Sequence, residues 1–155
     1  MPETADISAS IVESLYCDAL VLADEARAAF DLSGRLEQAS EDADLARIAL
    51  SCEALRTTTR MMHVLAWLLN QRAYFRGEMS EFQLRRHGRL PPQQTVADPA
   101  QLARLSPDVR ELVARTQQFY DRIARIDRGW RDRFAMQPAA VHRLRERLGA
   151  AVGAL

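Results

Sequence analysis

The sequence predicts an all-α protein: an antiparallel bundle of three long helices, with a short helix in the second connection and a loose or marginally helical C-terminal tail. Apolar residues recur at steps of three and four in three long stretches, and no stretch alternates as a half-buried strand would. Six Gly and six Pro are too few for a turn-rich β-sandwich. A length of 155 residues suits one domain. We expect residues 1–137 to form this helical-bundle domain and residues 138–155 to form the tail.

The first helix is predicted from Ser10 and Glu13, a hydroxyl followed three residues later by a carboxylate, which is the pattern of a capping box. Apolar residues then recur at helical steps and define one face. Ser33 and Gly34 are expected to end this helix. The positions on its apolar face are Ile11, Leu15, Leu22, Ala26 and Phe30.

The second helix is predicted to begin near Ser40 and to end at Gly77. Its later half carries two apolar stripes, so it must be buried on several sides, either at the bundle centre or in an oligomer interface. Three consecutive threonines, residues 57–59, are poor helix formers and favour either a tight bundle core or a partner-binding surface. The first stripe consists of Leu45, Ile48, Cys52, Leu55, Thr59, Met62, Leu65 or Ala66, Leu69 and Ala73, and the second of Met61, Val64, Leu68 and Phe75 with Trp67 nearby.

A short helix over residues 81–87 is predicted between a Ser80 cap and a Gly88 stop, followed by a proline-containing loop over residues 89–99. Ser106, Pro107 and Asp108 supply the cap, first-turn proline and acidic first turn of the third long helix. The apolar stripe of that helix is Val109, Leu112, Thr116, Phe119, Ile123, Ile126, Trp130 and Phe134, and Pro138 is expected to break it. Beyond it, Val141, Leu144, Leu148 and Val152 could form a marginal amphipathic helix.

The 21 basic residues, all arginine, balance 21 acidic residues, but their distribution is uneven. Residues 1–55 carry 12 acidic and 3 basic side chains, a net charge of −9, and residues 56–155 carry 9 acidic and 18 basic ones, a net charge of +9. Such asymmetry favours an acidic segment packing beside a basic one, within a chain or across a dimer. No apolar run approaches the roughly 18–20 residues of a membrane span, and the acidic N-terminus is unlike a secretion signal, so we expect a cytoplasmic protein.

Motifs for catalysis or metal binding are not evident. His63, His87 and His142 lie on different predicted elements, without the spacing of metal ligands. Cys17 and Cys52 are expected to be free, buried thiols. No glycine-rich phosphate loop or nucleophile elbow occurs. We therefore expect a protein that is not an enzyme and has no metal or cofactor.

Clusters of arginine leave a second class of function open. Arg85, Arg86 and Arg89 gather beside His87, and more arginines follow in the third helix and the tail, as in a phosphate-binding surface. Acidic residues such as Asp121 interrupt this pattern. A basic-faced bundle associated with nucleic acid is therefore the alternative, and nucleic acid is the less favoured partner.

Residues 53–62, followed by residues 67–73 and 77–79, resemble the core of the DUF1465 family. Residues 13–16 and 119–127 are similar in layout, and the resemblance covers residues 10–130. It implies a small three-helix bundle that forms a homodimer and has no enzymatic activity of its own. The family's characterised member is an adaptor that passes cell-cycle substrates to the ClpXP protease together with a response-regulator partner. ClpX, a response regulator and protein substrates are therefore the partners that the resemblance implies.

Two sets of contact residues follow for an adaptor of this kind. Arg85, Arg86 and Arg89 are the predicted partner-binding residues, because they lie in a connection, where binding residues concentrate. For the dimer interface we predict Trp67, Leu68 and Phe75, from the second stripe of the long central helix.

Overall fold

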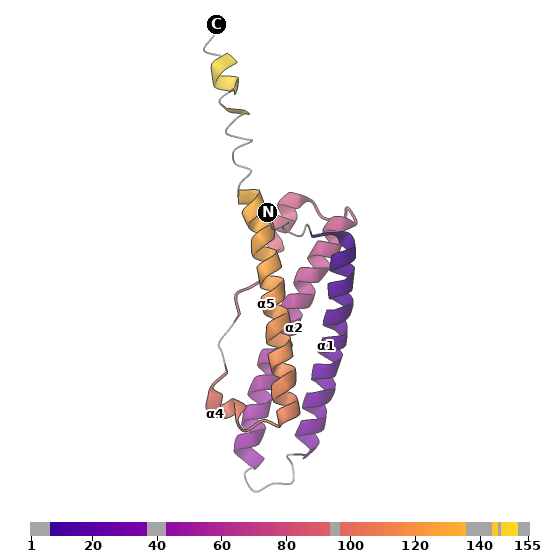
Figure 1. Ribbon diagram of the computed structural model, residues 1–155, viewed down its shortest axis with the longest axis vertical. Helices are drawn as coiled ribbons and strands as arrows, with labels where there is room; N and C mark the ends of the chain where they lie inside the picture. Colours follow the sequence, from indigo (N-terminus) through magenta and orange to yellow (C-terminus); the bar gives the residue numbers. More distant parts are fainter. Residues whose placement is uncertain (1–6, 37–42, 94–96, 136–143, 146, 152–155) are drawn as a thin grey trace, which may run out of the picture.

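The computed structural model describes residues 7–36, 43–93, 97–135, 144–145 and 147–151, and every regular element within these ranges is a helix. Three long helices, α1 (Ala9–Leu36), α2 (Ala43–Phe75) and α5 (Pro107–Ala135), pack into a bundle. The short helices α3 (Glu81–His87) and α4 (Pro99–Leu102) lie in the connection between α2 and α5 (Figure 1). Among the described helices none is long and apolar enough to span a membrane.

The third long helix has an unexpected direction. Whereas α1 runs antiparallel to its two neighbours, α2 and α5 run parallel (Figure 1). Arg60 of α2 bonds Thr116 of α5, and Trp67, two turns further along α2, bonds Asp127 further along α5. A later residue of α2 is thus paired with a later residue of α5, as expected for helices that run in the same direction. The prediction of an antiparallel bundle is right for α1 and wrong for the α2–α5 pair.

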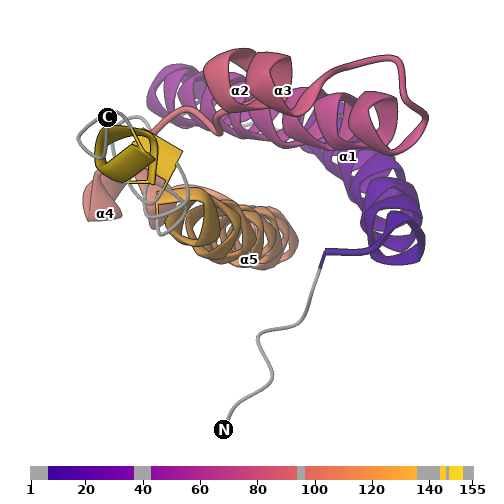
Figure 2. The same cartoon turned by 90° about the horizontal axis from the view of Figure 1, so that it is seen from above.

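The connection from α2 to α5 makes the parallel arrangement possible. Viewed along the bundle, α3 covers the outer side of α2 (Figure 2), and α4 lies at the opposite end of the molecule (Figure 1). The chain between α3 and α4 thus returns along the bundle, which a stretch of about ten residues at roughly 3.3 Å each can span. Leu90 and Ala97 of this return segment are buried and anchor it to the helices.

The helix ends follow local chemistry. Gly77 takes a φ of +76°, and the amide of Glu78 donates to the carbonyl of Ala73, so α2 ends in a Schellman motif as its glycine predicted. The Ser80 cap and Gly88 end of α3 are confirmed, as is the Ser106 cap of α5. The four-residue helix α4, capped by Asp98, was not predicted.

Both predicted ends of the first helix are wrong. Ser8 rather than Ser10 caps α1, because its hydroxyl accepts from the amide of Ile11. Ser10 lies inside the helix, where its hydroxyl contacts that of Ser8 at 3.0 Å. The helix also continues through Gly34 to Leu36. The helix begins earlier than predicted because Ser8, two residues before Ser10, competes successfully as the cap. It ends later because a single glycine is tolerated within a helix.

The core has two clusters along the bundle. The larger cluster joins all three long helices and includes Trp67, Leu68, Ile123 and the return-segment residue Leu90. The smaller cluster lies where α4 and the start of α5 meet the first turns of α2. It consists of Ala49, Leu50, Leu105, Val109 and Val113, with Phe30 and Leu102 packed against it.

The core face of α2 is not the face that its longest apolar stripe suggested. Met61, Val64, Trp67 and Leu68 of the second stripe are buried, whereas the first stripe faces outward. Both stripes have helical spacing, so periodicity alone could not choose between them. The expected apolar face of α5 is largely correct, although Phe119, Ile126 and Trp130 are only half-buried.

Some predictions fall on residues outside the described ranges, namely Ser40, Pro138, Val141, His142 and Val152. Of the predicted C-terminal segment, residues 144–145 and 147–151 are helical, and Leu144 and Leu148 are exposed.

Candidate functional site

Buried side chains on α2 and α5 form two parallel rows, which hydrogen bonds join at two positions. Each row advances by alternating steps of four and three, as in the seam of a coiled coil. Several members are polar yet buried, which makes this seam the most unusual part of the core. The row on α2 is Glu53, Thr57, Arg60, Val64, Trp67 and Gln71, and the row on α5 is Val109, Val113, Thr116, Tyr120, Ile123 and Asp127.

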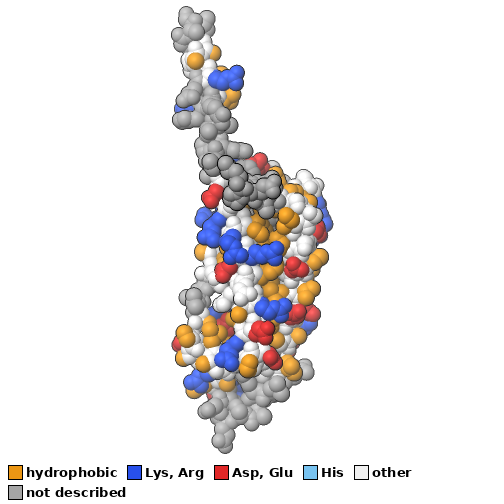
Figure 3. Space-filling view, in the orientation of Figure 1, with side chains coloured by type: hydrophobic (Ala, Val, Ile, Leu, Met, Phe, Trp, Pro, Cys, Tyr) orange, Lys and Arg blue, Asp and Glu red, His pale blue; other side chains and the backbone are white. Residues whose placement is uncertain are grey.

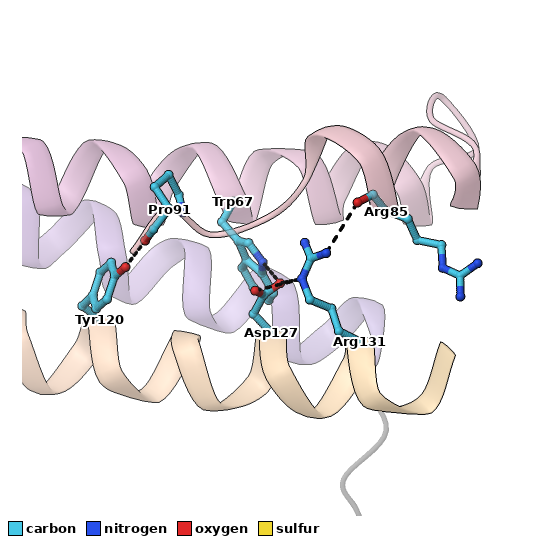
Figure 4. Close-up of polar contacts among 6 residues, drawn as sticks. All are labelled: Trp67, Arg85, Pro91, Tyr120, Asp127 and Arg131. Carbon is cyan, nitrogen blue, oxygen red and sulfur yellow. Dashed lines mark hydrogen bonds and ion pairs between the residues drawn. The ribbon is translucent and has the colours of Figure 1, made fainter. Parts of the chain in front are cut away.

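At one end of the seam, Asp127 connects three elements (Figure 4). The indole Nε1 of Trp67 donates to its carboxylate at 2.9 Å, and Nε of Arg131 donates to the same group at 3.1–3.2 Å. Arg131 also donates to the backbone carbonyl of Arg85 in α3 at 3.5 Å. The buried carboxylate thus accepts from one charged and one neutral donor, so this cluster fastens α3 and α5 to α2.

In the middle of the seam lies a buried guanidinium. Nη1 of Arg60 donates to the hydroxyl of Thr116 at 2.8 Å and makes a longer contact of 3.4 Å with that of Thr57. Thr116 in turn donates to the carbonyl of Val113. The Nε of Arg60 is buried without a hydrogen-bond partner in the described structure. Burial lowers the pKa of Arg60, against the opposing influence of the negative charges of Glu53 and Asp121.

Glu53 lies one turn before Thr57 on the same row. Its side chain is 2% exposed, and one of its oxygens pairs with Nη1 of Arg56 at 3.3 Å. The other carboxylate oxygen has no hydrogen-bond partner in the described structure. The carboxylate of Glu53 and the guanidinium of Arg56 thus lie in the same part of the molecule as the guanidinium of Arg60. Two positive charges accompany one negative charge there.

Tyr120 ties the return segment to the seam. Its hydroxyl donates to the backbone carbonyl of Pro91 (Figure 4). Burial raises the pKa of Tyr120, and the negative charges of Asp121 and Asp127 raise it further. The phenol is therefore held in its neutral, hydrogen-bond-donating form.

A pocket of about 330 Å³ opens beside Arg60 and Tyr120. It lies between α2, the return segment and α5, and it offers donors from arginine, histidine, threonine and amide side chains. No aspartate or glutamate of the described residues lines it. The lining residues are Cys52, Leu55, Arg56, Thr59, Arg60, His63, Gln93 and Tyr120.

The outer face of α2 carries a second feature, which we call the outer stripe. Its members alternate at steps of three and four over nearly the whole helix, and its five large apolar side chains are 48–69% exposed. The outer stripe consists of Leu45, Ile48, Cys52, Leu55, Thr59, Met62, Ala66, Leu69 and Ala73. An exposed apolar row of this length is typical of a surface that binds another protein.

The predicted partner-binding arginines lie together at one end of the bundle. Arg85 and Arg86 are exposed on α3, and Arg89 is exposed just after it. Phe82 of the same short helix is 70% exposed, so an aromatic ring accompanies these cations. The backbone of Arg85 also accepts the bond from Arg131, which holds α3 in place.

The predicted dimer residues are placed differently. Trp67 and Leu68 are 2% and 0% exposed within the single chain, because they form the centre of the larger core cluster. A second copy cannot reach them, so their assignment to a dimer interface is corrected to the core. Phe75, at the end of α2, is 39% exposed and packs edge-on against Tyr74.

Other candidate groups are scattered. His63 is half-buried in the pocket, whereas His87 is exposed. Both cysteines are free, as predicted, but Cys17 is exposed and Cys52 half-buried, so the expectation of buried thiols is wrong. Over the described part of the chain, no group of three or more His, Cys, Asp or Glu side chains could hold a metal ion.

Arginines elsewhere do not form one continuous basic face in the view of Figure 3, where acidic and hydrophobic side chains lie among them. Two of them instead fasten α1 to its neighbours. Arg115 of α5 pairs with Glu25 at 2.7 Å, and Arg72 of α2 pairs with Glu13 at 2.7 Å. The guanidinium of Arg72 also stacks 4.2 Å from the centre of the Tyr16 ring. The nucleic-acid alternative stays a prediction.

Sequence reasoning missed the seam and the pocket. The polar members of the seam share the step pattern of apolar core residues, and that pattern was a usable signal. The pairs themselves had no signal, since Trp67 and Asp127 are 60 residues apart.

The family described as "Protein of unknown function (DUF1465)" matches residues 3–152. No curated protein and no solved structure matches the chain.

Proposed function

The chain belongs to the DUF1465 family, and from that premise we propose that it is a non-enzymatic protein-interaction adaptor that assists regulated proteolysis of cell-cycle regulators by the ClpXP protease. This is the role of the family's characterised member, the regulator of CtrA degradation, and residues 53–79 resemble the core of that family. The observation that carries an interaction role is the outer stripe of α2, an apolar row left exposed although the core beneath it is complete.

The first proposed occupant of the outer stripe is a second copy of the chain. Steps of three and four match the seam of a two-helix coiled coil, so two such helices can pack together. Antiparallel packing about the middle of the helix brings Asp44 near the start of one α2 close to Arg76 just beyond the end of the other, and both are exposed. Opposite charges at both ends and opposed helix dipoles favour this symmetric arrangement.

The second proposed surface is the end of the bundle where α3 lies. The cations Arg85, Arg86 and Arg89 and the exposed ring of Phe82 offer charged and aromatic contacts, which suit a partner that presents an acidic surface, and we assign this role to the response regulator or to ClpX. This surface is separate from the middle of the outer stripe, so one protein could bind a partner while it remains a dimer.

Self-association is tested by light scattering of the purified protein at micromolar concentration. We expect a dimer for the wild type and a monomer for Met62→Glu, which places a charge in the middle of the outer stripe. Leu20→Glu is the matched control, because Leu20 is exposed on α1, away from the stripe. A monomeric wild type, or equal effects of the two substitutions, would contradict the dimer.

The adaptor role is tested by degradation of a cell-cycle substrate by purified ClpXP and a response regulator. We expect the protein to accelerate degradation, and Arg86→Ala with Arg89→Ala to abolish the acceleration while the protein stays folded by circular dichroism. Arg110→Ala, an exposed arginine on α5, is the control. Unchanged degradation across the family's candidate substrates would refute the adaptor role without affecting the dimer.

A further inference from the structure

We infer that the pocket beside Arg60 and Tyr120 binds a small organic anion whose phosphate or carboxylate group meets Arg56 and Arg60. Among the described residues, the ionisable side chains that line this pocket are Cys52, Arg56, Arg60, His63 and Tyr120, and none of them is a carboxylate. Arginine presents a fork of donors that matches the oxygens of both anions. The proposal depends on the pocket alone and goes beyond the adaptor role.

The charge balance around the pocket favours an anion. Arg60 is 6% exposed and Arg56 is half-buried, whereas Glu53 supplies one buried negative charge. Asp121 contributes a second negative charge, but it is exposed to solvent. Beside the pocket, the two guanidinium groups of Arg56 and Arg60 therefore outnumber the one buried carboxylate of Glu53. A buried charge without a counter-charge is costly, and a bound anion would relieve that cost.

The hydrogen bonds of Arg60 define which of its donors an anion can meet. Nη1 of Arg60 is occupied by threonine hydroxyls, while its Nε is buried without a partner in the described structure. Nε is closed to solvent, so it cannot itself meet a ligand in the pocket. An anion there would be bound by the other donors of Arg60 and by Arg56.

The dimensions and walls of the pocket define the rest of the ligand. Its volume of about 330 Å³ lies at the lower end of the range for small-molecule sites. Leu55, Cys52 and the ring of Tyr120 provide apolar walls, so the ligand carries a small apolar body beside its charged group. Thr59 and Gln93 can donate further hydrogen bonds to the anion.

The experiment is thermal unfolding of the full-length protein at constant ionic strength, titrated with phenyl phosphate, benzoate, inorganic phosphate or the neutral benzyl alcohol. We expect a saturable rise in Tm with phenyl phosphate or benzoate, a weaker rise with inorganic phosphate, and none with benzyl alcohol, because only a ligand that binds the folded state raises Tm. Equal stabilisation by benzyl alcohol, or no saturable rise with any anion, would overturn the proposal.

Two variants locate the effect. Arg56→Gln removes a charged donor and is expected to weaken phenyl phosphate binding at least about tenfold. Gln93→Glu places a negative charge at the exposed edge of the pocket and is expected to weaken binding as well, without disturbing the core. Arg110→Gln is the control. Unaltered affinity in both pocket variants would overturn the assignment of the site.

The test also separates the pocket from self-association. The pocket shares Cys52, Leu55 and Thr59 with the outer stripe but does not include Met62. The same titration of Met62→Glu is expected to give the wild-type affinity, whatever the oligomeric state. Loss of binding in that variant alone would place the anion in a dimer interface and would overturn a site built within one chain.

Discussion

Trp67 and Asp127 join the two parallel helices through one buried hydrogen bond, in which the indole N–H donates to the carboxylate at 2.9 Å. Asp127 also accepts from Arg131, which extends the cluster to α3. The pair therefore explains how a helix that enters the bundle from the far end is held in a defined register. A one-turn slip of α5 would leave both partners buried and unpaired, and this is a large cost in a low-dielectric interior.

Asp127→Ala should lower the free energy of unfolding by about 2–4 kcal/mol, because it leaves the Trp67 N–H and the half-buried Arg131 without their acceptor. Chemical denaturation followed by circular dichroism measures this change. Asp132→Ala, an exposed position on the same helix, should change stability by less than about 0.5 kcal/mol. Similar losses for the two variants would show that the cluster does not hold the helices together.

The long helices and several of their ends could be predicted from sequence, because the chemistry there is local. Ser80, Ser106 and Gly77 each act on backbone groups within a few residues. The direction of α5 could not be predicted in this way. The connection between α2 and α5 is long enough to place the start of α5 at either end of the bundle, and the buried bonds that decide the outcome are remote in sequence.

The choice of the core face of α2 illustrates a second limit. Its outer stripe is more uniformly apolar than its buried row, which contains Glu53, Arg60 and Gln71. Hydrophobicity therefore favours the wrong face. Buried Arg60 is tolerated because its guanidinium finds a hydroxyl partner on α5, Thr116, and no pattern within α2 alone contains that information.

Gln71 provides a direct test of the polar seam. It is 1% exposed, and neither its amide nitrogen nor its oxygen has a hydrogen-bond partner in the described structure. Burying an amide without partners costs about 1–3 kcal/mol, so Gln71→Met, which keeps the shape, should raise the free energy of unfolding by about 1 kcal/mol. Denaturant unfolding measures the change. A loss of stability instead would mean that the amide has a partner, such as an ordered water.

Two glycines should respond in opposite ways to alanine. Gly129 lies in α5 with nothing within 4 Å of an added Cβ, so Gly129→Ala should raise stability by about 0.5–1 kcal/mol through helix propensity. Gly77 adopts a φ of +76°, so Gly77→Ala should lower stability by about 1–2 kcal/mol. Thermal unfolding of the two variants gives the comparison. A gain in stability for Gly77→Ala would show that α2 does not depend on the left-handed residue at its end, and a loss for Gly129→Ala would contradict the gain expected from helix propensity.

Tyr120 should make stability depend on alkaline pH. Its pKa is raised in the folded state, chiefly by burial, whereas in the unfolded chain it titrates near pH 10. Above about pH 10 the folded state therefore binds more protons than the unfolded state, and the free energy of unfolding falls as pH rises towards and through the folded pKa. The stabilisation by the neutral phenol is complete below the unfolded pKa and disappears above the folded one.

The matching variant is Tyr120→Phe, which leaves the Pro91 carbonyl without its donor. Near neutral pH this variant should lose about 0.5–1.5 kcal/mol, and above about pH 10 its stability should fall less steeply than that of the wild type. Denaturant unfolding at a series of pH values measures both effects, and the absorbance of tyrosinate reports the late titration of one of the three tyrosines. Parallel pH profiles for variant and wild type would show that Tyr120 is not the group responsible, because the alkaline loss would then come from groups that both proteins share.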